Sequence, residues 1–490
     1  MFSAKLRLSL YVCLVCSLLL STALAQTPPT NVIFNTQIYT TGASPAGVVS
    51  GDFNEDGKPD LAVIDNGSNS VQLLLGVGAG LFTLGGQTNT GVNPAQIVTG
   101  KFNLASHQDL AIANAGDRTM TILLGKGDGT FTTESFPLGG VPTALIAADF
   151  LNNGRTQLAV IECAGQQLGP CTLNLYQSDA NANFTRSQKI SLPGNLSSSL
   201  IVSDDFNHHH MPDLAVATAT QVLVFANTSS FNGTGTATVA LRATITPPNT
   251  AGISGLAAGH FVTGNPTPDL AIEVFDNVND TSFPNTCYIF LNNGFGSFFL
   301  RSKLVTEGFG NILAVADING DGIQDLLVAG ISFHNGGLDF ALGHGDGTFS
   351  PIQNAGGFGP NTGITTRDVA LDSRHSIVLT ASGAFGTPGT GVLLNQNALT
   401  NCPPPGSAKL AVKVCSISTA INQISIQASG NSPNGVKRVE LWVDGVKRTQ
   451  NFSDQLRATV VATPGTHRVT VVGVDLYDAL IKQTTFVSVP

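Results

Sequence analysis

The sequence predicts an all-β fold with two domains, a seven-bladed β-propeller followed by a small β-sandwich. The first observation is an Asp-rich loop that returns about every 50 residues, as expected of a repeat architecture. The second is that the segments between loops are short, rich in β-branched residues and bounded by Gly-rich turns, without helical periodicity. The third is the alternating pattern of residues 409–490, which follows a Pro-rich linker at 400–408.

Each repeat has the same internal order. An apolar strand precedes the loop, two strands follow it, and a further strand begins after a Gly-rich turn, so that each repeat supplies the four strands of a propeller blade. Residues 32–39 resemble the strand that follows the turn, whereas the last repeat ends at 391–395 without one. We therefore expect the N-terminal strand to complete the seventh blade and remove both open edges. The loops begin at Asp52, Lys101, Asp149, Asp205, His260, Asp317 and Asp368.

Most of the Gly-rich turns end in Phe. Glycine supplies the positive φ of tight hairpin turns, and we expect the Phe side chain to pack between neighbouring sheets. A linear β-solenoid is the alternative architecture, which we disfavour because its repeats are usually shorter. The closing aromatic residues are Phe82, Phe131, Phe184, Phe298 and Phe349.

Two loops carry a full set of oxygen donors for a hard cation. Side-chain oxygens stand at the first, third, fifth and ninth positions, and the backbone carbonyl of the seventh residue adds another, which is typical of calcium loops. An EF-hand is excluded, because Val stands where its twelfth-position Glu is needed and strand-forming residues follow. The alternative is a plain Asp/Asn/Gly turn without metal. The predicted calcium ligands are Asp52, Asn54, Asp56, the Lys58 carbonyl and Asp60, and Asp317, Asn319, Asp321, the Ile323 carbonyl and Asp325.

The other loops have lost ligands. We expect no tight calcium site in those beginning at Lys101, Asp149, His260 and Asp368. The Asp205 loop keeps three positions but has His209 at the fifth, a poor ligand for calcium. The run 208–210 could instead bind a transition metal. We favour a solvated loop, because successive side chains point in different directions and no second Cys/His cluster lies nearby.

The N-terminal residues 1–25 read as a secretory signal. Lys5 and Arg7 precede an apolar run at 8–20, and Ala23-Leu24-Ala25 forms a small-residue cleavage site. The run is too short to span a bilayer, so we expect a secreted or cell-surface monomer that is not membrane-spanning. The net charge of −9 argues against nucleic acid as a partner.

Five cysteines follow the predicted signal. Export would permit disulfides, and Cys163 with Cys171 could close a hairpin, while Cys402 with Cys415 brackets the linker. Cys287 is then left over, and we expect it to be buried as a small apolar side chain.

The frame Asp-x-Asn-x-Asp-Gly-x-x-Asp-Leu, with the Gly-Asp-Gly-Thr-Phe turns, resembles the FG-GAP (VCBS-type) repeats of integrin α-subunit propellers and of secreted bacterial relatives. The resemblance covers roughly residues 31–399 and is strongest in the loops at Asp52 and Asp317. It implies a seven-bladed propeller with calcium on its rim. It also implies an exported adhesion or ligand-binding role, although some members carry propellers beside enzyme domains.

The C-terminal residues resemble a bacterial immunoglobulin-like (Ig-like) module. Short alternating strands in this length indicate a sandwich, Asp444-Gly445 marks a hairpin, and Trp442 is most simply a core residue. Such modules act as spacers or binding units. The expected strands are 410–415, 423–428, 436–443, 446–449, 458–462, 467–474 and 484–489.

No catalytic motif is found, so we expect a non-catalytic protein. The few candidates for catalysis are Glu162, Glu273 and Arg367. The leading hypothesis is a secreted calcium-binding scaffold for adhesion or for binding an extracellular protein or glycan. The alternatives are a lectin propeller and, third, a polysaccharide hydrolase or lyase.

Overall fold

The structure is a computed structural model that describes residues 34–489 apart from short internal gaps. The predicted signal and the Pro-rich linker lie outside the described residues. The gaps are residues 43, 166–168, 196–199, 231–234, 249–251, 276–283, 308, 320, 332–336, 357–360, 368–375, 382–388, 396–410, 421–422, 432–435, 452–454 and 476–479.

Seven four-stranded antiparallel sheets form the first domain, and each is one blade. Blade 1 contains β2 (Pro45–Gly51), β3 (Asp60–Asp65), β4 (Ser70–Gly78) and β5 (Leu81–Asn89). Blade 2 contains β6 (Pro94–Gly100), β7 (Asp109–Asn114), β8 (Thr119–Gly125) and β9 (Phe131–Pro137). Blade 3 contains β10 (Val141–Ala148), β11 (Gln157–Cys163), β12 (Pro170–Ser178) and β13 (Phe184–Asn195). Blade 4 contains β14 (Leu200–Asp204), β15 (Asp213–Ala217), β16 (Val222–Asn227) and β17 (Val239–Ile245). Blade 5 contains β18 (Gly252–Gly259), β19 (Asp269–Phe275), β20 (Pro284–Asn292) and β21 (Phe298–Glu307). Blade 6 contains β22 (Phe309–Ala316), β23 (Asp325–Ile331), β24 (Gly337–Ala341) and β25 (Gln353–Gly356). Blade 7 contains β26 (Asn361–Arg367), β27 (Ser376–Ala381), β28 (Gly389–Asn395) and β1 (Phe34–Tyr39).

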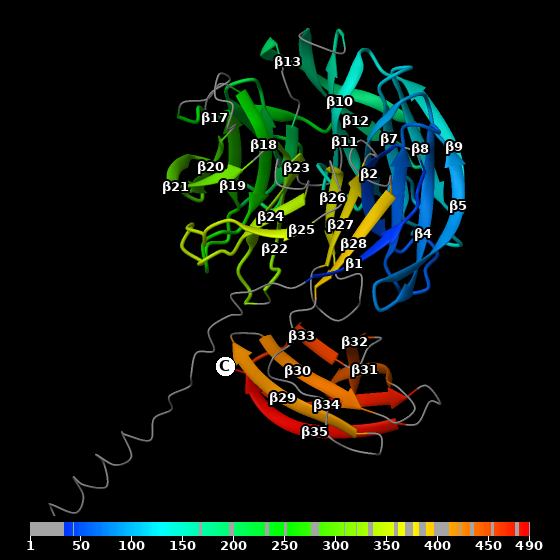
Figure 1. Ribbon diagram of the computed structural model, residues 1–490, viewed down its shortest axis with the longest axis vertical. Helices are drawn as coiled ribbons and strands as arrows, with labels where there is room; N and C mark the ends of the chain where they lie inside the picture. The colour runs from blue at the N-terminus through cyan, green and yellow to red at the C-terminus, as the bar shows by residue number, and fades with distance from the viewer. Residues whose placement is uncertain are drawn as a thin grey trace, which may run out of the picture. The chain divides into compact units, whose positions relative to one another are not determined.

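The blades close into a ring (Figure 1). The first strand of each blade contacts the first strand of the next, and β26 of the last blade contacts β2 of the first. The N-terminal strand β1 pairs with β28 from Phe34↔Asn395 to Tyr39↔Thr390, which makes it the outer strand of blade 7. The predictions of seven blades and of closure by the N-terminal strand are therefore confirmed.

The second strand of each blade explains why these short segments are stable. In β3, β7 and β15 every residue is buried, because neighbouring blades cover both faces of the sheet. A continuous apolar run of this length is typical of a strand buried on both sides. Such strands place the core between blades, in a series of inter-blade clusters.

Aromatic pairs join neighbouring blades, as the sequence predicted. The Phe after the first loop residue of one blade packs edge-on against the closing Phe of the next. The ring-centroid distances are 6.1 Å for Phe53–Phe131, 5.6 Å for Phe102–Phe184, 5.8 Å for Phe206–Phe298 and 5.2 Å for Phe261–Phe349.

A cavity of about 370 Å³ lies among the innermost strands. Small, apolar and uncharged polar side chains line it, including Val48 of β2, Ile97 of β6, Leu256 of β18 and Thr365 of β26. None of the residues described as lining this cavity carries a titratable side chain.

The C-terminal domain is a sandwich of two sheets, with orders β29-β30-β33 and β32-β31-β34-β35. Asp444 and Gly445 both have positive φ, 52° and 82°, as the predicted hairpin turn requires. The core contains Ile424, Leu441 and Val471. The strands are β29 (Ala411–Ala420), β30 (Gln423–Asn431), β31 (Val436–Val443), β32 (Val446–Asn451), β33 (Gln455–Val461), β34 (Gly465–Asp475) and β35 (Leu480–Val489).

Trp442 is not a core residue, and that expectation was wrong. Side chains alternate along a strand, and Val439, Leu441 and Val443 of β31 occupy the buried face. Trp442 is therefore on the opposite face, where it is half-buried and its indole Nε1 donates to Glu440 Oε2 at 2.8 Å.

The cysteines follow the sequence predictions where the structure describes them. Cys163 and Cys171 form a disulfide across the β11–β12 hairpin. Cys287 is a free thiol in the core. The pairing of Cys402 with Cys415 lies outside the described residues.

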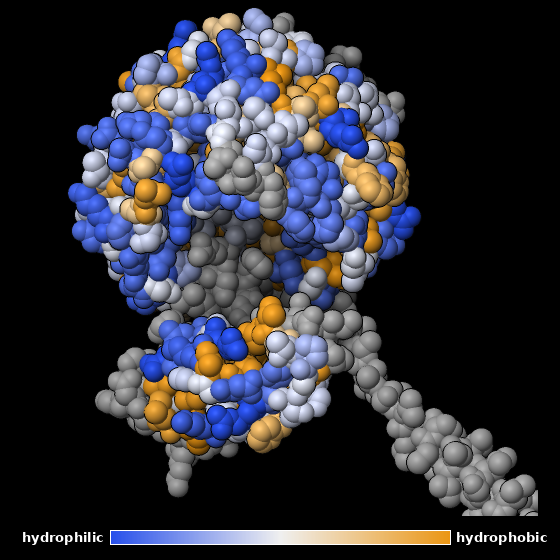
Figure 2. Space-filling view, turned by 180° about the vertical axis from the view of Figure 1, so that it is seen from behind, coloured by the Kyte–Doolittle hydropathy of each residue, from blue (hydrophilic) through white to orange (hydrophobic). Residues whose placement is uncertain are grey.

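On the face shown in Figure 2, apolar residues form small scattered groups among hydrophilic ones. No helix among the described residues is long and apolar enough to cross a membrane.

Candidate metal-binding loops and a basic depression

The ninth loop residue clamps blades 1, 2, 5 and 6 through two backbone hydrogen bonds. Both oxygens of Asp60 accept backbone N–H groups, from Phe53 at 2.9 Å and Gly76 at 2.8 Å. Asp325 accepts in the same way from Ile318 and Gly343, both at 2.8 Å. The clamp ties the loop to the third strand.

The clamp does not depend on a cation. Asp109 and Asp269 make the same pair of bonds in loops that lack the first-position Asp. Sequence reasoning assigned this position to metal binding alone and missed its structural role, although its recurrence in the degenerate loops was a usable signal. Burial raises the pKa of the Asp325 carboxyl to about 7, and the neighbouring Asp321 and Asp317 add to the rise.

The Asp52 loop gathers its predicted ligands through its own backbone. Asp52 Oδ2 accepts from Gly57 N at 3.0 Å, Asn54 Oδ1 from Asp56 N at 3.1 Å, and Asp56 Oδ1 from Lys58 N at 2.9 Å. The Lys58 ammonium also lies 2.8 Å from Asp56 Oδ2. Asp52 Oδ1 is buried without a hydrogen-bond partner.

The Asp317 loop repeats this arrangement with one difference. Asp317 Oδ2 accepts from Gly322 N at 2.8 Å, and Asn319 Oδ1 accepts from Asp321 N at 3.0 Å. Its seventh residue is Ile323, which brings no charge to the loop. The donor sets of both loops contain only oxygen atoms and fit calcium. Asp52 Oδ1 accepts no hydrogen bond within the protein, so it is free to bind a cation.

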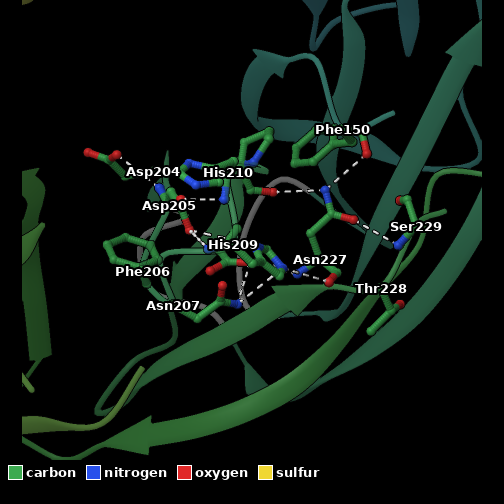
Figure 3. A network of polar contacts seen from close by, with 12 residues as sticks. Phe150, Asp204, Asp205, Phe206, Asn207, His209, His210, Asn227, Thr228 and Ser229 are labelled. Carbon is green, nitrogen blue, oxygen red and sulfur yellow. Dashed lines mark hydrogen bonds and ion pairs between the residues drawn. The ribbon is translucent and has the colours of Figure 1, made fainter. Parts of the chain in front are cut away.

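A third loop brings metal-ligating side chains closest together. Among the described residues, Asp205, His209 and Asp213 form a group of three whose ligand atoms all lie within 4.8 Å of one another. Figure 3 shows Asp205 and His209 in this loop. The expectation of a solvated histidine run holds for His208 and His210, which are exposed, but not for His209, which is half-buried. Sequence reasoning looked for a second Cys/His cluster and did not combine His209 with Asp205 and Asp213, which it considered only as remaining calcium-loop positions.

The candidate catalytic carboxylates serve the fold. Glu273 is fully buried and accepts from Ser254 Oγ at 3.1 Å and Thr306 Oγ1 at 2.8 Å, and burial raises its pKa to about 7. Glu162 accepts from the Tyr176 hydroxyl at 2.6 Å. The side chain of Arg367 lies outside the described residues.

A depression of about 760 Å³ lies on the outer face of the β32-β31-β34-β35 sheet. Trp442 lies in it beside Glu440, whose carboxylate accepts from Arg438 Nε at 2.6 Å. The cationic side chains that line it are Arg438, Lys447, Arg468 and Lys482.

Two segments match known protein families. Residues 309–337, which contain the Asp317 loop, match the FG-GAP repeat, and residues 416–471 match the bacterial Ig domain. No curated protein sequence shows a significant match to the chain.

One of two similar solved structures reaches a TM-score of 0.50, which indicates a shared fold at low sequence identity. A crystal structure of BBS1N in complex with ARL6DN, soaked with mercury, is 10% identical, with a TM-score of 0.50 over 75% of this chain and 98% of that chain. A functionally unknown protein from Desulfotomaculum acetoxidans DSM 771 is 9% identical, with a TM-score of 0.43 over 82% of this chain and 98% of that chain. Together, the seven-sheet ring, the C-terminal sandwich and the two family matches show a β-propeller that contains an FG-GAP repeat at residues 309–337, followed by a sandwich that contains a bacterial Ig domain at residues 416–471.

Proposed function

We propose that the protein is a secreted calcium-binding propeller that serves as a non-catalytic scaffold for adhesion or for binding an extracellular protein or glycan. The observation that carries the proposal is the pair of oxygen-only donor sets in the Asp52 and Asp317 loops. Each loop joins the first strand of its blade to the second, so both belong to the same face of the ring.

Calcium in these loops would neutralise clustered carboxylates and tie each loop to its blade. Asp52, Asn54, Asp56 and Asp60 would hold the ion in blade 1, with Asp317, Asn319, Asp321 and Asp325 as their counterparts in blade 6. The carbonyls of Lys58 and Ile323 would complete the two sets. Because the clamp bonds of Asp60 and Asp325 use both oxygens, those residues would serve the ion through their remaining lone pairs.

Two observations support export. A disulfide joins Cys163 and Cys171, and disulfides persist mainly in oxidising compartments. The match of residues 416–471 to a bacterial Ig domain agrees with an extracytoplasmic location.

The described lining of the inner cavity contains no titratable side chain. Propeller enzymes commonly place acids and bases around the centre of the ring, whereas the described lining residues here are small, apolar or uncharged. Glu162 and Glu273 are buried between strands and do not line this cavity. The loop-rich face therefore remains the surface that we assign to a partner.

Calcium titration by calorimetry, with thermal unfolding in calcium and in chelator, tests the proposal. We expect about two equivalents to bind, and saturation at 100 times the dissociation constant to add about 2.7 kcal/mol to stability. Absence of binding would contradict the calcium assignment. Turnover of a polysaccharide substrate would contradict the non-catalytic role.

The variant Asp321→Ala assigns the binding to the loops. Its melting temperature should fall in calcium and change little in chelator, because the side chain's main task in this proposal is to hold the ion. Asp149→Ala is the matched control, since Asp149 accepts from Gly154 N at 2.7 Å in a loop that has lost the third- and ninth-position ligands. Equal losses for Asp321→Ala with and without calcium would refute the ligand assignment.

A second candidate function is binding of an acidic glycan by the Ig-like domain. The depression around Trp442 favours it, because a half-buried indole and four cationic side chains against one carboxylate suit a sugar ring that carries carboxylate or sulfate groups. Binding to an array of acidic and neutral glycans, with Trp442→Ala as the variant, tests it. Equal retention of neutral and acidic glycans would count against it.

A further inference from the structure

We propose that the loop of blade 4, residues 205–213, is a binding site for a divalent first-row transition metal such as Zn²⁺, with Asp205, His209 and Asp213 as ligands. The proposal concerns a different loop and a different class of metal from the calcium sites, and it stands independently of them.

The first step is the position of the imidazole. His209 lies between the two carboxylates, with Nδ1 at 3.5 Å from Asp205 Oδ1 and Nε2 at 3.9 Å from Asp213 Oδ1. Neither distance is that of a hydrogen bond. Two ligand atoms that are each about 2 Å from one ion lie at most about 4 Å apart, so the distance between Nδ1 and Asp205 suits a shared ion. Asp213 approaches the other ring nitrogen, and it belongs to the site as a member of the group whose ligand atoms lie within 4.8 Å of one another.

The second step is the protonation of the ring. Nε2 lies 3.1 Å from the carbonyl oxygen of Asn227, which only accepts, so Nε2 carries the proton and donates it (Figure 3). The lone pair then resides on Nδ1, which is buried and lacks a hydrogen-bond partner. Histidine ligands of metals are typically held in this manner, with one nitrogen donating to a carbonyl or carboxylate and the other facing the ion.

The third step is the amide of Asn207. Its Oδ1 is buried without a hydrogen-bond partner, while its Nδ2 lies 3.2 Å from Asp213 Oδ1 and 3.3 Å from His209 Nε2. Asn207 occupies the third loop position, which supplies an amide oxygen in the calcium loops. Two unsatisfied buried acceptors, one nitrogen and one oxygen, therefore occur within a single loop, and a cation would satisfy both.

The backbone places the two carboxylates before any ion binds. Asp205 accepts from His209 N at 3.1 Å and from His210 N at 2.7 Å, as the first-position Asp does in the calcium loops. Asp213 accepts from Asn227 N at 2.7 Å. An open hollow of about 500 Å³ between β10 and β14 reaches Asp205 and His210 and gives access from solvent.

The fifth loop position determines the metal preference. Blades 1 and 6 have Asp56 and Asp321 there, and their all-oxygen sets suit calcium, which takes oxygen ligands. His209 replaces one of these oxygens with an imidazole nitrogen, a donor that suits zinc, copper, nickel and iron. A single substitution in a shared frame thus separates two classes of site within one ring.

The flanking histidines provide internal controls. The rings of His208 and His210 pack on each other at 5.2 Å and are exposed. Both residues have positive φ, 59° and 65°, a conformation that Asn tolerates well. Replacing both with Asn therefore removes two imidazoles while preserving the loop backbone.

The test is titration of the untagged protein with Zn²⁺ by calorimetry in excess calcium, with Co²⁺ absorption as a second probe. We expect one equivalent of Zn²⁺ and a visible Co²⁺ spectrum of a site with mixed nitrogen and oxygen ligands. His209→Asp should weaken Zn²⁺ binding by more than 100-fold, because loss of a residue that only supports a ligand typically costs 10- to 100-fold. The same variant should bind one more equivalent of calcium than the wild-type protein, because Asp at the fifth position restores the all-oxygen set. His208→Asn/His210→Asn should leave Zn²⁺ binding unchanged.

Melting of each variant without metal establishes that it is folded. Zn²⁺ binding that survives His209→Asp, or that disappears in the His208→Asn/His210→Asn variant, would overturn the proposal, since the surface histidine pair would then be the site. Failure of the wild-type protein to bind Zn²⁺ would also overturn it, whereas failure to bind calcium elsewhere would bear only on the proposed scaffold function.

Discussion

Lys58 and Ile323 make two otherwise similar loops different. Both occupy the seventh position, where the backbone carbonyl is the predicted ligand, but the Lys58 ammonium lies against the Asp56 carboxylate. Both partners are partly exposed, so solvent screens the pair and its worth is on the order of 1 kcal/mol or less. An incoming calcium ion would have to displace this ammonium or bind beside it.

We therefore expect Lys58→Ile to tighten calcium binding at the Asp52 loop by about two- to fivefold. The reciprocal variant Ile323→Lys should weaken binding at the Asp317 loop by a similar factor. Calorimetric titration of the two variants measures both effects. Affinities that do not change in opposite directions would show that the seventh side chain does not influence the ion.

Glu273 predicts a pH dependence of stability. Burial raises the pKa of this carboxyl from 4.5 to about 7, so the folded protein holds the proton more tightly than the unfolded chain. The stability contributed by this proton is fully present below about pH 4.5 and is lost as the pH rises through about 7. The loss is on the order of 3 kcal/mol, since one pKa unit corresponds to about 1.4 kcal/mol.

Glu273→Gln should remove this part of the pH dependence. The variant should gain stability relative to the wild-type protein between pH 5 and pH 8, because the amide cannot ionise and still bonds Ser254 and Thr306. Urea unfolding across this range measures the difference, with the exposed Glu134→Gln as a control. Parallel pH profiles for Glu273→Gln and the wild-type protein would contradict the prediction.

Neighbouring blades are joined by a repeated contact between loop and strand. The carbonyl of the aromatic residue at the second loop position accepts a side-chain hydrogen bond from the next blade, from Ser178 to Phe102 at 2.7 Å, from Asn227 to Phe150 at 3.0 Å and from Asn292 to Phe206 at 2.7 Å. The ring of the same residue usually packs against the closing Phe of that blade. Degenerate loops keep these contacts, which explains how they fold without a full ligand set.

Phe102 should be among the costly side chains to truncate. It is fully buried and packs on Phe184 of the next blade, so Phe102→Ala removes core contacts and leaves a cavity. We expect a loss of about 3–5 kcal/mol in the free energy of unfolding. Chemical denaturation measures it, with Phe295→Ala as the control because Phe295 is 70% exposed. A loss below about 1 kcal/mol for Phe102→Ala would mean that blade contacts at this loop are dispensable.

Closure of the ring depends on a strand that is distant in sequence from its blade. β1 covers the edge of β28 along Phe34–Tyr39, and an uncovered edge strand is a template for pairing with other chains. Tyr39 also packs on Phe82 of blade 1 at 5.6 Å, so β1 joins the last blade to the first.

Deletion of residues 34–39 should therefore open the ring. We expect lower thermal stability and a tendency to associate through β28, detectable by scattering and by size-exclusion chromatography. Adding the deleted segment as a peptide should reverse part of the effect, which distinguishes loss of the strand from general misfolding. A truncated protein that stays monomeric with an unchanged melting temperature would contradict this account of closure.

The sequence was sufficient for the fold because the signals for the fold are local. Fully apolar second strands such as β3, the loop at Asp52 and the turn before Phe131 each encode a strand or a turn within a few residues, and repetition implies the ring. The number of blades and the strands of the Ig-like domain could be predicted for the same reason. The spacing of Asp and Asn predicts the ligand residues of the Asp52 and Asp317 loops, and their binding of calcium stays a prediction.

Tertiary structure was needed wherever a role depends on contacts that are remote in sequence. The structural role of Asp325, beside its predicted role as a metal ligand, appears only when Gly343, two residues after the third strand, donates to it. The lone pair on His209 Nδ1 is defined by the carbonyl of Asn227, which β16 brings to the loop. Trp442 lies outside the core because the alternation of β31 against its partner sheet buries Leu441 instead. Spacing along the chain specifies which donors a loop contains, whereas the protonation, burial and partners that give those donors their chemistry arise only when separate strands pack together.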